Sequence, residues 1–107
     1  RMSRLDQALD VARRTAEAQE HPAIIYAIAR EVALGIVALS EMELPADEKA
    51  EWLEQFSAAA VEMLKLAKRD GYFSDSEAAE FLSEDPYLAP LRPREDFQAL
   101  LESLESE

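Results

Sequence analysis

Residues 23–42 are the most apolar stretch of the chain and constrain its fold more than any other feature. They include only three charged residues, Arg30, Glu31 and Glu41, and no proline. At about 100° per residue of an α-helix, Arg30 and Glu41 fall on nearly the same side, so most of the circumference is apolar. This pattern is typical of a helix covered by its neighbours. The sequence therefore predicts a central helix that is buried along most of its girth.

The same stretch is long enough to cross a membrane, which takes about 20 apolar residues. However, Arg30 and Glu31 stand near its middle, where each would cost about 2.5 to 3.5 kcal/mol in a bilayer. The flanking residues, 20–22 and 43–45, offer no basic or aromatic anchor. We therefore expect the buried helix of a soluble protein and no membrane partner.

Composition favours one all-α domain over residues 1–107. The chain has 49% apolar residues and few helix breakers, with 2 glycines and 5 prolines, which suits a small helical core. It contains no cysteine, which excludes disulfides and thiolate metal sites. No signal peptide is visible, so a cytoplasmic location is expected. Because Arg1 precedes Met2, we expect this sequence to be a piece of a longer chain.

The net charge of −12 limits the classes of partner. A phosphate backbone needs a surface rich in lysine and arginine, so nucleic acid is not expected to bind. Anionic lipid is repelled for the same reason. A protein or peptide partner remains, and the acidity also serves solubility.

Hydrophobic spacing predicts five helices, over residues 4–19, 23–42, 47–69, 75–83 and from 93 to about 104. The third is the most regular. Lys68 and Arg69 lie in its last turn, as the helix dipole favours, and Gly71 is predicted to be its left-handed C-cap. Its apolar stripe consists of Trp52, Leu53, Phe56, Ala60, Met63, Leu64 and Ala67.

Residues 74–107 are predicted to form a capping segment that packs on the preceding helices. Prolines punctuate residues 85–93, yet this part is too apolar for a flexible linker. The side chains expected to point inward are Ala78, Phe81 and Leu82 in the short helix, and Tyr87, Leu88 and Leu91 after it.

Two patterns resemble tetratricopeptide-repeat proteins. Ala60, Leu64 and Ala67 have the small–large–small spacing of the second helix of such a repeat. Residues 71–73, 82–88, 90–92 and 94–97 resemble the closing segment of bacterial arrays, including those that follow serine/threonine kinase domains in planctomycete-type proteins. The resemblance implies a degenerate C-terminal repeat with right-handed helix-pair packing. However, the central and third predicted helices together exceed the repeat period of about 34 residues.

Candidate chemistry is sparse, and we predict no catalytic residue, no metal site and no cofactor. His21 is the only histidine and precedes Pro22 at a helix start, where a solvated turn residue is expected. Glu80, Glu84 and Asp85 have the spacing of a solvated helix face. The chain has no glycine-rich phosphate loop, no EF-hand spacing and no kinase signature.

One strip on the central helix is a candidate partner-binding surface: Tyr26, Arg30, Leu34, Val37 and Glu41. In tetratricopeptide arrays the first helix of each pair lines the groove where partners lie, and this mix of residues suits a binding hot spot. The competing interpretation is that the first or last helix covers the strip. We therefore expect a non-catalytic protein–protein interaction or scaffolding module. The alternatives are a self-associating helical bundle, forming a homo-oligomer, and, third, a small-molecule-binding or carboxylate-based enzyme domain.

Overall fold

A computed structural model describes residues 3–19, 21–74 and 76–105, and every regular element in these ranges is helical. The prediction of an all-α fold with five helices is confirmed. The α-helices are α1 (Ser3–Ala18), α2 (Pro22–Glu41), α3 (Ala46–Arg69), α4 (Ser76–Glu84) and α5 (Glu95–Glu105). Two 3₁₀-helices connect them near the C-terminal end, η1 (Tyr72–Ser74) and η2 (Pro86–Leu91).

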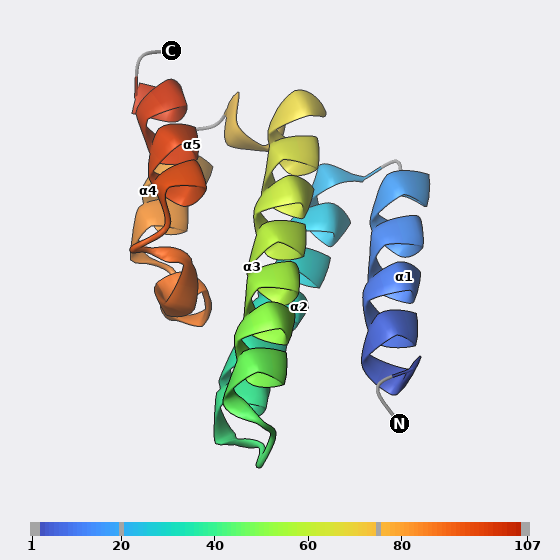
Figure 1. Cartoon of the computed structure of the whole chain (residues 1–107). Helices are drawn as coiled ribbons and strands as arrows, with labels where there is room; N and C mark the ends of the chain where they lie inside the picture. Colours follow the sequence, from blue (N-terminus) through green and yellow to red (C-terminus); the bar gives the residue numbers. More distant parts are fainter. Residues whose placement is uncertain (1–2, 20, 75, 106–107) are drawn as a thin grey trace.

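The helices α2 and α3 form an antiparallel pair at the centre of the molecule (Figure 1). In this view α3 lies in front of α2, α1 lies on one side of the pair, and α4 and α5 lie on the other. The molecule measures 42 × 28 × 18 Å along its principal axes. The pair therefore spans the thin dimension, which leaves α2 at one broad surface.

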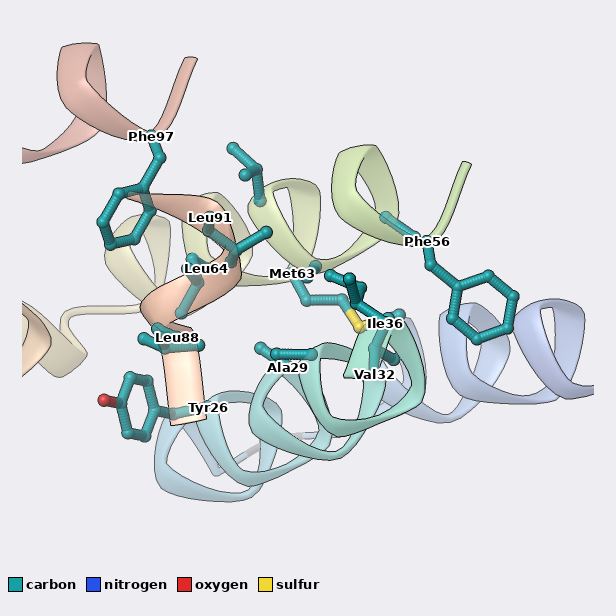
Figure 2. Close-up of a cluster of buried hydrophobic side chains, with 14 of the residues drawn as sticks. Tyr26, Ala29, Val32, Ile36, Phe56, Met63, Leu64, Leu88, Leu91 and Phe97 are labelled. Atoms are coloured by element: carbon teal, nitrogen blue, oxygen red, sulfur yellow. The ribbon is translucent and has the colours of Figure 1, made fainter. Parts of the chain in front are cut away.

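Small residues allow α2 and α3 to approach closely. Ala29 and Ala33 of α2 and Ala60 of α3 have no exposed surface. Gly35 has a similar role, because a Cβ atom there would lie 2.9 Å from Cε2 of Phe56, closer than such atoms normally come. Figure 2 shows how the larger core side chains, among them Ile36, Met63 and Leu64, fill the space between the helices.

The predicted burial of α2 along most of its girth is wrong. Seven of its 20 residues are buried, and they face α3 and its neighbours: Ile25, Tyr26, Ala29, Val32, Ala33, Ile36 and Leu39. The opposite side is exposed, including Leu34 at 46% and Val37 at 44%. The reason is geometric, because α1 packs on one side of the α2–α3 pair and α4 and α5 pack on the other, so no described helix covers the outward side of α2.

By length and hydropathy alone, α2 is the one described helix that would suit a membrane span. Its most apolar window has a mean hydropathy of 1.8, and 39% of that window is buried inside the fold. The buried part forms the core of the helical protein. The remaining apolar residues form the exposed side described above.

Over its described residues, the C-terminal segment packs on the preceding helices. Leu82, Leu88, Leu91 and Phe97 are completely buried. Figure 2 shows Leu88 of η2 between Tyr26 and Leu64, and Leu91 between Leu64 and Phe97. Two other side chains do not point inward as predicted: Phe81 is 45% exposed and Tyr87 is 42% exposed.

Arg94 ties the start of α5 to α3. Its Nη1 and Nη2 atoms donate to the two carboxylate oxygens of Glu54 at 2.8 and 3.1 Å, and its Nε donates to Asp96 at 2.9 Å. These hydrogen bonds from Arg94 lower the pKa of both Glu54 and Asp96. Because Glu54 is largely exposed, this bidentate pair contributes less than about 1 kcal/mol.

The turn that follows α3 depends on the glycine at position 71. Gly71 has a φ of +92°, which confirms its predicted left-handed conformation, and residues with a Cβ atom pay about 1–2 kcal/mol there. Gly71→Ala should therefore lower the free energy of unfolding by about that amount. Gly71→Asn is the matched control and should lose less, because asparagine tolerates this region. Urea denaturation of both variants is the measurement, and equal losses would contradict the prediction.

Candidate functional site

The structure divides the candidate strip into two environments. Tyr26 is 4% exposed and the side chain of Arg30 is 32% exposed, because η2 and α4 lie against them. Leu34, Val37 and Glu41, farther along α2, are exposed. The first two residues therefore contact the chain's own capping segment, and the last three face solvent.

Asp85 joins the capping segment to α2. Its side chain is completely buried and is the only buried charged group among the described residues. One oxygen, Oδ1, accepts a hydrogen bond from the backbone N–H of Tyr87 at 2.9 Å, which caps η2. The other, Oδ2, accepts the Tyr26 hydroxyl at 2.5 Å and lies 3.0 Å from Nε of Arg30. A buried carboxylate without such partners would cost several kcal/mol.

Tyr26 is held in an aromatic cluster that favours its neutral form. Its ring stacks on Tyr72 at 5.0 Å between centroids and meets Phe73 edge-on at 5.9 Å. Burial, and then the hydrogen bond to Asp85, raise the pKa of Tyr26 well above its usual range. The phenol therefore stays protonated and remains a donor to the carboxylate.

Arg30 pairs with Asp85 and also touches aromatic rings. Its Nε atom is buried and makes no aligned hydrogen bond, so the 3.0 Å contact with Oδ2 is an ion pair without a directed hydrogen bond. The Cζ atom lies 4.2 Å from the ring centre of Tyr87 and 5.9 Å from that of Phe81. These are cation–π distances, which explains why two large aromatic side chains remain half exposed beside Arg30.

The exposed side of α2 forms a continuous surface, which we call the α2 face. It consists of Ala23, Ala27, Arg30, Leu34, Val37, Ala38 and Glu41. All are exposed except the partly buried Arg30. At about 100° per residue they occupy one arc of about 100° on the helix. Five of the seven are apolar, and the two charged residues are separated by Leu34 and Val37.

Two hollows lie elsewhere on the described surface. The first, of about 400 Å³, lies between α1 and the α2–α3 pair and is lined mainly by apolar side chains such as Val11, Ile28 and Phe56. The second, of about 540 Å³, lies between the end of α3 and α5, with Lys65, Lys68 and Arg69 on its wall. Lys68 Nζ donates to Ser103 Oγ at 2.9 Å, so this basic group helps to hold α5 on α3.

The other sequence candidates lie apart from any built site. His21 is exposed at the start of α2 and caps nothing with its side chain. Glu80 and Glu84 are exposed on α4, as a solvated helix face predicts. The same interpretation is wrong for Asp85, which is buried at the N-cap of η2. Within the part of the chain that the structure describes, no cluster of three or more acidic or histidine side chains is able to hold a metal ion.

The role of Asp85 is the main feature that sequence reasoning missed. A local signal was present, since an aspartate directly before a proline is a common helix N-cap followed by a proline at the first helical position. No local sequence pattern indicated that Asp85 would contact Tyr26 and Arg30 of α2. The hydrogen bond to Tyr26 joins residues 59 positions apart in the sequence, and no local periodicity reports a contact of that range.

No family model matches the chain, and no curated protein or solved structure matches it significantly. The likeness to tetratricopeptide repeats therefore rests on the sequence patterns alone. The three residues of its small–large–small pattern, Ala60, Leu64 and Ala67, are all completely buried. This burial accounts for the pattern as core packing.

The Tyr26–Asp85 hydrogen bond makes stability depend on pH in a defined direction. At neutral pH, Tyr26→Phe should lower the free energy of unfolding by about 1.5–3 kcal/mol, as expected for a hydrogen bond to a charged group. Above about pH 10 the unfolded wild type loses its tyrosine proton while the folded protein keeps it. The wild type therefore loses stability there, by up to about 1.4 kcal/mol per pH unit. The variant has no titrating group at position 26, so it does not lose stability for this reason.

The difference in stability between wild type and Tyr26→Phe should therefore narrow as the pH rises above about 10. Urea denaturation of both proteins, at neutral pH and at several alkaline values, measures it. Tyr72 and Tyr87 are present in both proteins and cancel in the comparison. A difference that stays constant across this pH range would contradict the assigned role of Tyr26.

Proposed function

We propose that this chain is a non-catalytic protein–protein interaction module that binds a helix of its partner along the α2 face. The observation that carries the proposal is the exposure of Leu34 at 46% and Val37 at 44% next to each other on a helix whose other side forms the core. Single exposed apolar residues are common on protein surfaces. A continuous apolar face flanked by charges is instead typical of an interaction site.

The dimensions of the α2 face favour a helical partner. From Ala23 to Glu41 it extends for about 27 Å, or about five helical turns. In the N-terminal half of α2, the capping segment lies against Tyr26 and Arg30. An amphipathic helix presents an apolar stripe of this length and width when it docks on such a surface.

Charge defines the partner helix further. Arg30 lies between Ala27 and Leu34 in the face, and Glu41 lies at its C-terminal end. A helix with an apolar centre, an acidic group opposite Arg30 and a basic group opposite Glu41 would be complementary in both respects. The alanines at positions 23, 27 and 38 leave room for larger partner side chains.

The proposal involves no reaction. The buried carboxylate of Asp85 is engaged by a backbone N–H, a phenol and a guanidinium, and these contacts hold η2 against α2. An acid that fixes two elements of the fold is a structural group. The binding surface is therefore the feature of the described residues that best suits a function.

Photo-crosslinking tests the proposal directly. Leu34→benzoylphenylalanine places a reactive ketone in the centre of the α2 face, and the same replacement at Glu51, exposed on α3, is the matched control. In cells that express the protein, illumination should give a protein adduct from position 34 and little from position 51. The mass of the adduct identifies its partner. Equal labelling at the two positions, or no adduct from position 34, would refute the proposal.

A further inference from the structure

We infer that the helix that docks on the α2 face is α2 of a second copy of this chain, running antiparallel to the first. This inference rests on the proposed function and names its partner. It comes from four residues of the face, because the midpoint between Arg30 and Glu41 is also the midpoint between Leu34 and Val37. A two-fold axis through this midpoint places Arg30 of one copy opposite Glu41 of the other, and Leu34 opposite Val37.

Glu41 and the exposed part of Arg30 are available to a partner outside their own helix, although Arg30 already pairs with Asp85. Arg30 and Glu41 lie on the same side of α2 but about 16 Å apart along its axis, at about 1.5 Å per residue. They cannot pair with each other at this distance. Among the described residues Glu41 has no ion pair, whereas Arg30 uses its buried Nε toward Asp85 and keeps part of its side chain at the surface.

The helix dipole adds to this argument. Glu41 is the last residue of α2, and the last turn contains no basic residue. A negative charge at the C-terminal end of a helix is unfavourable, since the dipole is negative there as well. Lys49 Nζ already donates to the carbonyl oxygen of Ser40 at 3.1 Å and offsets part of the dipole. In the antiparallel pair, Arg30 of the second copy approaches Glu41 and compensates its charge.

Orientation follows from the same charges. A parallel pair would place Arg30 against Arg30 and Glu41 against Glu41, and like charges across an interface disfavour that arrangement. The antiparallel pair has opposite charges at both ends and apolar residues between them. Alanines along the face allow the helix axes to approach to about 8–10 Å, at which Leu34 and Val37 of the two copies touch.

Sedimentation velocity over a micromolar to millimolar concentration series tests the association. The mass of the wild-type protein should rise from 12.0 kDa toward twice that value. Leu34→Glu should remain monomeric over the same series, because it places charges near the axis. Glu41→Arg should weaken the dimer at least tenfold at low salt, since Arg30 then meets an arginine. Glu51→Arg makes the same charge change on α3 and should leave the dimer unaffected.

Disulfide trapping tests the orientation without background, because the chain contains no cysteine. Leu34→Cys and Val37→Cys variants are oxidised separately and as a mixture. In the antiparallel pair positions 34 and 37 face each other, so the mixed disulfide should form faster than either homodimeric one. Faster trapping of 34 to 34 and of 37 to 37 would overturn the inference.

The outcomes separate this inference from the proposed function. A protein that stays monomeric at all concentrations, while position 34 crosslinks to a different protein, overturns the second copy and leaves the interaction module standing. A monomer without any adduct at position 34 overturns both.

Binding of the monomer to phosphatidylcholine vesicles would also overturn the inference, with lipid as the occupant. A concentration-dependent dimer that Leu34→Glu does not disrupt would overturn it as well. Because Leu34 is exposed, the Leu34→Glu variant should fold normally, and an unchanged circular dichroism spectrum should confirm this.

Discussion

The buried carboxylate of Asp85 is the interaction on which the arrangement of the molecule depends. It accepts hydrogen bonds from Tyr26 and from the backbone at the start of η2, pairs with the charge of Arg30, and so connects the C-terminal segment to the central helix. An unpaired buried charge is far more costly than a solvated one, so this geometry permits few alternatives. With η2 fixed in this way, Leu88 and Leu91 lie in the core between α2 and α3.

This anchor also determines which part of α2 remains open. The capping segment lies against Tyr26 and Arg30, and it ends its contact with the strip there. Beyond that point Leu34, Val37 and Glu41 face solvent. Arg30 therefore belongs to both regions, as the ion partner of Asp85 and as a residue of the α2 face.

The periodicity of the sequence was sufficient to predict the helices and much of the core. In α3 nearly every residue of the predicted stripe is buried, because a stripe at helical spacing reports a local property. Asp85, Phe81 and the outward side of α2 were beyond such reasoning. The environments of Asp85 and Phe81 depend on a helix distant in the sequence. An apolar helix face, in turn, has the same pattern whether it contacts its own chain or another one.

Leu34 and Val37 are open to solvent in the monomer, whereas Leu88 and Leu91 are enclosed. Paramagnetic relaxation of methyl signals by a soluble gadolinium chelate, measured by NMR at low protein concentration, compares these four residues directly. The structure predicts strong relaxation at Leu34 and Val37 and little at Leu88 and Leu91. Equal protection of all four would mean that another part of the chain covers the α2 face, and would contradict the account.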